Sequence, residues 1–177
     1  MDDFRLKDCA RLGLLICALV FVSSLTPAQD YSARVRNAQT DSAYKKLIDA
    51  HIFNFGGVGF AAQITPEEKA FRVLLESWNR VSVFKQLLNE ANPEGQLYAL
   101  YGLYLEDRDS FEKEAEKLKL TADLPPRRGI FFPVEKGKVL IGRGCLLLHE
   151  DQRAVIEEIA KGKFDHAFRS NDTRLFY

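Results

Sequence analysis

The sequence lacks an excess of charge of either sign. Its 177 residues include 25 basic and 25 acidic side chains, which gives a formal net charge of zero. Nucleic-acid-binding domains usually carry a clustered basic surface, and no block of like charge occurs in this chain. Residues 112–119 come nearest to such a block, but they mix both signs, as a solvated helix face does. We therefore expect no nucleic-acid partner.

Cysteine is scarce, with three in the chain. Cys9 and Cys17 lie within the first 28 residues, so a mature chain that begins near Gln29 keeps Cys145 alone. We therefore expect no disulfide in the mature protein. The apolar neighbours of Cys145, residues 146–148, favour a buried thiol, and the alternative is a reactive one. No H-x-x-x-H or C-x-x-C spacing occurs, which argues against a metal site, and no sequence feature implies a cofactor.

A complete nucleotide-binding motif is also missing. The glycine-rich run FGGVGF, residues 55–60, lacks the Lys and Ser/Thr that a phosphate-binding loop requires after its glycines. It contains G-x-G-x-x-A, a variant of the dinucleotide-binding fingerprint, but Pro66 and the absence of a following βαβ unit disagree with that motif. We expect the glycines to provide positive φ angles or close packing that turns Phe55 and Phe60 into the core. The alternative is a ligand-contacting loop whose binding residues are Phe55, Gly56, Gly57 and Gly59.

An uncharged apolar run is present near the N-terminus, from Leu12 to Val22. It is shorter than the about 18 residues of a membrane-spanning helix, and it fits the hydrophobic region of a secretory signal. Ala28, with Thr26 two positions before it, forms a tolerable cleavage site. We therefore predict a signal peptide at residues 1–28 and an exported protein, periplasmic or extracellular. Two alternatives stay open, namely an uncleaved membrane anchor formed by residues 12–25 and a buried core helix.

The rest of the chain is expected to form one domain. Residues 29–39 are polar and have no sustained apolar stripe, so we expect a flexible spacer there. Residues 40–177 then form a single globular domain. Thr40 or Asp41 is expected to cap its first helix.

Residues 65–120 carry the strongest helical pattern. Residues 65–68, Thr-Pro-Glu-Glu, combine an N-cap with a proline at the first helical position and an acidic first turn. Apolar residues recur at helical spacing as far as Trp78, and again over residues 81–91. A further helix is expected to begin at residues 92–94, Asn-Pro-Glu. It is apolar nearly all round, so we expect it to lie at the centre of the fold. Asp109 is expected to cap the helix that follows it. These four helices are expected to form two αα-hairpins.

The C-terminal part changes character. Two prolines within residues 124–129 mark a loop. The residues that follow predict a β-hairpin with strands at 130–135 and 138–149. Its tight turn is expected at Lys136-Gly137.

A final helix is expected after this hairpin, capped by Asp151 and closed by Gly162. The strands are segregated from the helices rather than alternating with them. The predicted fold class is therefore α+β, mainly α, with a four-helix core, an appended C-terminal β-hairpin and a final helix.

The candidates for catalysis are Cys145 and three histidines. Cys145 and His149 lie four residues apart, which on a strand puts them about 13 Å apart. That separation excludes direct contact. A Cys–His dyad would need His51 or His166, brought in by the fold.

Two further sets of residues are candidates for binding. Tyr98, Tyr101 and Tyr104 recur every three residues and could line a groove for a peptide or glycan. The alternative is a helix–helix contact whose hydroxyls reach the boundary. Arg127 and Arg128 could form a small anion-binding loop, or they could only keep that loop soluble.

These patterns favour an exported, non-catalytic protein, a small and mainly helical binding module for an unknown protein or envelope component. The alternative is a secreted or periplasmic hydrolase-type enzyme that uses Cys145 with a histidine. Contact with a membrane is expected only through an uncleaved N-terminal segment.

Overall fold

The computed structural model describes residues 27–57, 63–122 and 136–170. The predictions for residues 1–26, Gly59, Phe60, Arg127 and Arg128 lie outside these ranges. Chain contacts divide the protein into two units, residues 1–39 and 40–177. The second unit holds nearly all of the described elements.

The first described helix, α2, spans Pro27–Ile48. It begins well before Thr40 and Asp41, so the prediction that one of them caps this helix is wrong. The backbone is also helical over residues 29–39, where the sequence analysis expected a flexible spacer. From Thr40 onward, α2 belongs to the second unit and buries Ala43 and Leu47 in its core.

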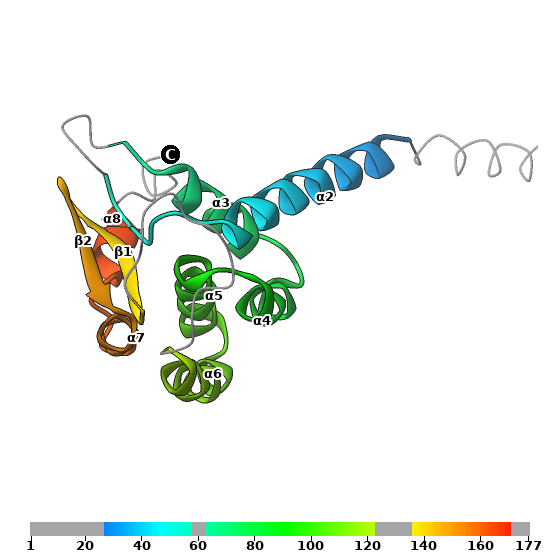
Figure 1. The fold of residues 1–177 in the computed structure, drawn as a ribbon. Coiled ribbons are helices and arrows are strands. Elements are labelled where there is room, and N and C mark those ends of the chain that lie inside the picture. Colours follow the sequence, from blue (N-terminus) through cyan, green and yellow to red (C-terminus); the bar gives the residue numbers. More distant parts are fainter. Residues whose placement is uncertain (1–26, 58–62, 123–135, 171–177) are drawn as a thin grey trace, which may run out of the picture. The chain divides into compact units, whose positions relative to one another are not determined.

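Four helices follow in two hairpins, as predicted (Figure 1). They are α3 (Pro66–Leu75), α4 (Arg80–Glu90), α5 (Pro93–Glu106) and α6 (Arg108–Thr121). The Thr65 hydroxyl caps α3 by accepting from the Glu68 backbone N–H, and the Asn92 side chain caps α5 by accepting from the Gly95 N–H.

The cap of α6 is Asp107 and not Asp109. Asp107 Oδ1 accepts from the Ser110 N–H at 3.1 Å, and Oδ2 accepts from the Ser110 hydroxyl at 2.6 Å. The sequence offers two aspartates at this helix start, and both suit an N-cap by type. The choice depends on where α5 ends, which is at Glu106.

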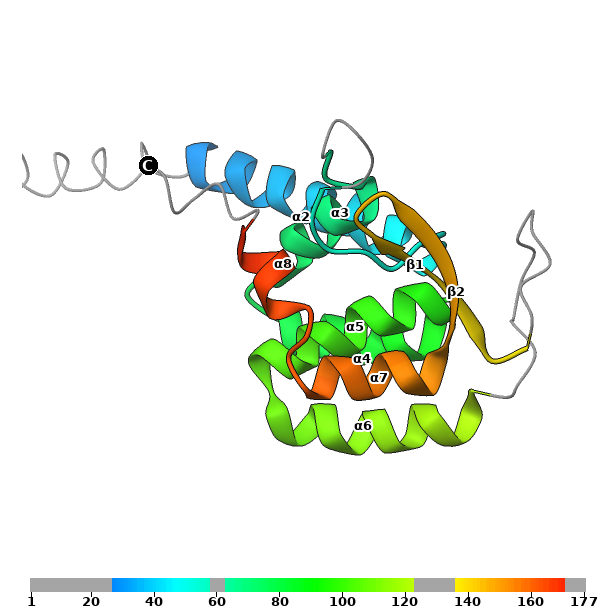
Figure 2. The same ribbon diagram turned by 90° about the vertical axis from the view of Figure 1, so that its left-hand side faces the viewer.

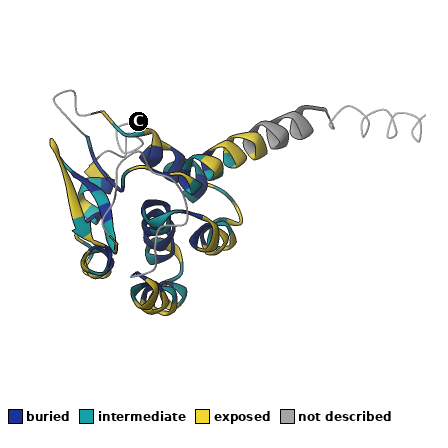
Figure 3. Ribbon diagram, in the orientation of Figure 1, coloured by how far each residue is buried: buried dark blue, intermediate teal, exposed yellow. Residues whose placement is uncertain are grey.

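Helix α5 lies at the centre of the second unit, as its apolar sequence predicted. It contacts α3, α4, α6, α7 (Gln152–Ala160) and β1 (Lys138–Arg143), and most of its residues are buried (Figures 1 and 3). Figure 1 shows α4, α6 and α7 around it, and Figure 2 shows the same helices from the side. Gly102 allows close packing here, because a side chain at this position would collide with the Phe84 ring.

The β-hairpin is present, but its turn lies elsewhere than predicted. Strand β1 is Lys138–Arg143 and β2 is Leu146–Asp151, paired antiparallel with Arg143 opposite Leu146. The two-residue turn is therefore Gly144-Cys145, where Gly144 has φ 59°. Lys136-Gly137 instead precedes β1, and the Gly137 carbonyl accepts from Gln152 N–H. The proposed strand at 130–135 lies outside the described ranges.

Two helices end the described chain. Asp151 caps α7 (Gln152–Ala160) as predicted, with Oδ1 accepting from the Arg153 and Ala154 N–H groups. Gly162 follows at φ 70° and closes it. A further helix that the sequence pattern did not predict, α8, spans Asp165–Ser170 and buries Phe168.

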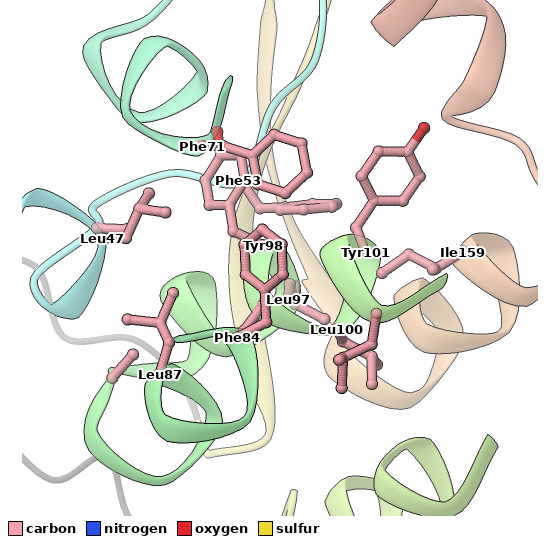
Figure 4. Packing of buried hydrophobic residues seen from close by; sticks show 14 of the residues in the cluster. Leu47, Phe53, Phe71, Phe84, Leu87, Leu97, Tyr98, Leu100, Tyr101 and Ile159 are labelled. Carbon is pink, nitrogen blue, oxygen red and sulfur yellow. The ribbon is translucent and has the colours of Figure 1, made fainter. Parts of the chain in front are cut away.

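The core is rich in aromatic rings, which Figure 4 shows together with the leucines around them. Phe71 is central to it, with ring centroids of five other aromatic residues between 5.3 and 5.8 Å from its own. Trp78 is not part of it. The prediction that the helical repeat continues as far as Trp78 is wrong, because α3 ends at Leu75 and Trp78 is 91% exposed in the following turn.

Within the described ranges, no helix combines the length and the apolar character that are needed to cross a membrane. Residues 12–25, the alternative anchor, lie outside those ranges.

Candidate functional site

The glycine run turns the chain into the core at Phe55 and Gly56. Gly56 has φ 95°, a backbone conformation that favours glycine, and Phe55 is buried. The Gly56 N–H donates to Glu68 Oε2 at 2.9 Å. These residues therefore have a structural role, while Gly57 is half-buried at the end of the described segment.

Glu68 is the partner that holds this loop. Its carboxylate is fully buried and accepts two hydrogen bonds from Arg72, from Nε at 3.1 Å and from Nη2 at 2.7 Å. Burial raises the pKa of Glu68, while the hydrogen bonds from Arg72 and Gly56 lower it. Arg72 also donates to the Phe168 carbonyl and lies over the Phe168 ring. The sequence pattern around Glu68 indicates a helix start, but it does not indicate this link between α3, the loop and α8.

Glu94 has a comparable position at the start of α5. Its side chain is buried, and Oε1 accepts from the Leu140 N–H at 3.0 Å. Oε2 is buried as well and has no hydrogen-bond partner. Burial raises the pKa of Glu94, while the hydrogen bond from the Leu140 N–H and, to a smaller extent, the charges of His51 and His149 lower it. The fold thus brings two of the three histidines to a carboxylate that the sequence analysis did not select.

A sequence signal for this pair of carboxylates does exist. Both Glu68 and Glu94 stand in Pro-Glu helix starts, and each one binds a backbone N–H from a distant segment. The dipole of the helix N-terminus favours an acidic residue there. Helix-start patterns indicate where such carboxylates lie, but they do not identify the distant partner.

Two of the three tyrosines of α5 lie in the core, and Tyr104 packs against it. Tyr98 and Tyr101 are fully buried. The Tyr98 hydroxyl donates to the Asn54 carbonyl and accepts from the Asn54 N–H, and burial raises its pKa. Tyr101 and Tyr104 donate to the two oxygens of Asp165. This arrangement corresponds to the packing alternative, with the hydroxyls satisfied at the boundary.

Cys145 lies in the hairpin turn and is exposed. The prediction of a buried thiol is therefore wrong, because the apolar residues that follow it lie on an exposed strand. His149 is four residues along β2, and His166 is exposed on α8. The described residues contain no group of three side chains that could hold a metal ion.

We expect the Cys145 thiol to react with a thiol reagent in the folded protein at a rate within about tenfold of its rate in the unfolded chain, because the Cys145 side chain is exposed. The measurement is reagent uptake before and after denaturation, with Cys145→Ser as the control for Cys9 and Cys17. A thiol that reacts only after denaturation would contradict this geometry.

The other exposed feature of the hairpin is a run of leucines on β2. Leu146, Leu147 and Leu148 are 61%, 58% and 38% exposed. Side chains alternate between the two faces of a strand, so these leucines are exposed on both faces of β2. We call Leu146–His149 the β2 edge.

The backbone of the β2 edge also offers hydrogen bonds. Phe53 N–H donates to Leu140 O, and Gly142 N–H donates to Phe53 O, so Leu140 and Gly142 direct their polar groups away from β2. Their cross-strand partners are His149 and Leu147. In an antiparallel pair, these partners direct their own N–H and C=O groups to the outer side. No hydrogen bond recorded for the described residues uses those groups.

Comparisons of this chain with protein-family models, with curated proteins and with solved structures find no match.

Proposed function

We propose that this chain is an exported, non-catalytic binding module that adds an extended segment of a partner protein to the β2 edge. The observation that carries this proposal is the combination of three exposed leucines with outward N–H and C=O groups at Leu147 and His149. Exposed, flat apolar strands favour pairing with another chain, and most proteins protect such edges with charge or proline. Residues 146–148 carry neither.

The chemistry of the β2 edge indicates the kind of segment that fits. Backbone hydrogen bonds supply affinity in strand addition, and alternating side chains supply specificity. Leu147 faces one side of the hairpin, while Leu146 and Leu148 face the other. The partner segment is therefore extended, uncharged at its centre and apolar on both faces.

The hairpin is held in place before any partner binds. Phe53 forms a parallel bridge with Ile141 on the inner side of β1. Arg143 bonds both Glu150 on β2, at 2.6 and 2.7 Å, and Glu158 on α7. A preorganised edge loses less conformational entropy on binding than a flexible one.

Export is part of the proposal and rests on the sequence. The apolar run Leu12–Val22 and the cleavage site at Ala28 support it. The hydrolase alternative has one supporting observation, the exposed Cys145. Because His51 and His149 are associated with Glu94 instead, we rank the binding module first.

Leu147→Lys is expected to abolish strand addition, because a charge at the middle of the edge opposes an apolar partner. The test is a selection of displayed random ten-residue peptides against the purified full-length chain, followed by affinity measurements. We expect selected peptides to lose about tenfold or more in affinity for Leu147→Lys, the loss typical of an interface hot spot.

Leu120→Lys is the matched control, since Leu120 is 84% exposed but lies at the end of α6. Circular dichroism establishes that both variants are folded. Peptides that bind Leu147→Lys as well as the parent, or a selection that yields no binder, would contradict the proposed function.

A further inference from the structure

We propose that Glu94, with His51 and His149 beside it, is a proton-binding clamp that sets how firmly the β1–β2 hairpin is held against α5. The hairpin carries the β2 edge, so this inference rests on the proposed function and adds a means of regulating it.

The clamp is a carboxylate at the point where the parallel backbone pairing between the Phe53 segment and β1 stops. Phe53 N–H donates to Leu140 O, so a continued parallel pair would have the His51 carbonyl accept from Leu140 N–H. Glu94 Oε1 accepts that hydrogen bond instead. The neighbouring Asn92 holds the same segment, with Nδ2 donating to the Ala50 carbonyl at 2.5 Å. One carboxylate therefore joins α5 to β1 beside His51.

The free oxygen makes this joint sensitive to protons. Glu94 Oε2 is buried and has no hydrogen-bond partner, which is costly for an ionised carboxylate. A proton on Oε2 removes the charge and leaves Oε1 free to accept from Leu140. Burial accordingly raises the pKa of Glu94 above its ordinary value.

Two histidines oppose this shift from different elements. His149 lies on β2, directly opposite Leu140, and His51 lies on the segment that follows α2. A positive charge on either histidine stabilises the ionised form of Glu94, which lowers the Glu94 pKa. Among the described residues, these two histidines are the side chains whose charges act most on the Glu94 carboxyl.

The direction of the pH effect follows from these shifts. The folded state binds the Glu94 proton more tightly than the unfolded chain does, where a Glu titrates at about 4.3. The contribution of Glu94 to stability is therefore greatest at low pH, and it falls as the pH rises through the folded-state pKa. The hairpin is held more firmly in acid than at neutral pH.

The test is amide hydrogen exchange of Leu140 in the full-length chain from about pH 5 to about pH 8, expressed as protection relative to intrinsic exchange. We expect protection to fall with rising pH in the parent and to stay level in Glu94→Gln, which keeps an acceptor oxygen without the charge. Glu94→Ala removes the acceptor and is expected to lower protection about 5- to 100-fold throughout.

The histidines allow a readout that a purely structural role would not change. The carboxyl 13C shift of Glu94 in the unmodified protein gives the titration directly, without any substitution. In the double variant His51→Gln/His149→Gln the midpoint is expected to move to higher pH, because the charges that lower the pKa are gone. His166→Gln, on α8, is the matched control and is expected to leave the midpoint unchanged.

Two results would overturn the clamp: Leu140 protection with the same pH dependence in the parent and in Glu94→Gln, or a midpoint that the double histidine variant does not move. Peptide binding separates this inference from the proposed function. If peptides still require Leu147 but the clamp does not titrate, the inference fails and the function stands. If Glu94 titrates as expected and no peptide requires Leu147, the clamp is supported, but the proposed function and the regulation of it by the clamp are both contradicted.

Discussion

Replacing Arg72 with alanine is expected to lower the free energy of unfolding by about 3–5 kcal/mol. The Glu68 side chain is fully buried and that of Arg72 is only 15% exposed, so water does not replace the lost partner. Glu68 would keep the Gly56 N–H as a donor and lose both guanidinium hydrogen bonds. A buried carboxylate with so few partners is among the most costly defects that a single substitution produces.

The same substitution has a defined pH dependence. The hydrogen bonds from Arg72 lower the pKa of Glu68, so their loss raises it further. A raised carboxyl pKa means that stability is lost as the pH rises through the folded value, and is retained below it. The loss of unfolding free energy caused by Arg72→Ala is therefore expected to become smaller as the pH falls and Glu68 is protonated.

Urea unfolding at several pH values measures these effects. Arg80→Ala is the control, because Arg80 pairs with Glu106 near the surface with 39% of its side chain exposed, where a pair contributes about 0–1 kcal/mol. Glu68→Gln combined with Arg72→Ala should recover part of the loss, since it leaves no buried charge. A loss for Arg72→Ala no larger than that for Arg80→Ala would show that Glu68 is not a buried charge in the folded protein.

Phe71→Ala is expected to cost about 3–5 kcal/mol of folding free energy, the range for removing a buried aromatic ring. Phe71 is fully buried, and its ring lies 5.3 Å from Phe55, 5.6 Å from Phe84 and 5.7 Å from Phe168, centroid to centroid. These neighbours come from a loop and from helices α4 and α8, so they cannot all close on the vacated space. The cavity left behind adds to the lost transfer free energy.

Trp78→Ala is the matched control for this experiment. Trp78 is the larger aromatic residue, but it is 91% exposed, so its removal is expected to change stability by no more than about 0.5 kcal/mol. Both variants are compared by urea unfolding. A larger loss for Trp78→Ala than for Phe71→Ala would contradict this structure, in which Phe71 is buried and Trp78 is exposed.

The starts of α3, α5 and α7 were predicted correctly because their determinants are local. Thr65 and Asn92 each accept a hydrogen bond from the backbone three residues later, and that contact requires no distant segment. The apolar character of α5 likewise implied central burial, since a helix that is apolar all round cannot face water on any side. The helical hairpins follow from these starts and from short connections.

Turns and helix ends were predicted less well where two local solutions compete. Lys136-Gly137 and Gly144-Cys145 both offer a glycine that accepts positive φ, and both glycines adopt it. Only the pairing of β1 with β2 makes Gly144-Cys145 the hairpin turn. Trp78 continued the helical period, yet α3 ends three residues before it. In the hairpin and in α3 alike, the residue pattern of the strand or helix continues past the point at which the backbone changes direction.

By itself, the sequence determined the order and type of most elements, the central place of α5 and the start of three helices, because capping and hydrophobic periodicity act over a few residues. Tertiary structure alone decided the candidate sites. Glu94 meets Leu140 across 46 positions of sequence, and Arg72 meets Phe168 across 96. The leucines after Cys145 are exposed for the same reason, since burial depends on whether another element covers the strand. Contacts between distant segments have no local signature, so only the folded chain shows which carboxylate meets the histidines and which apolar strand is left at the edge.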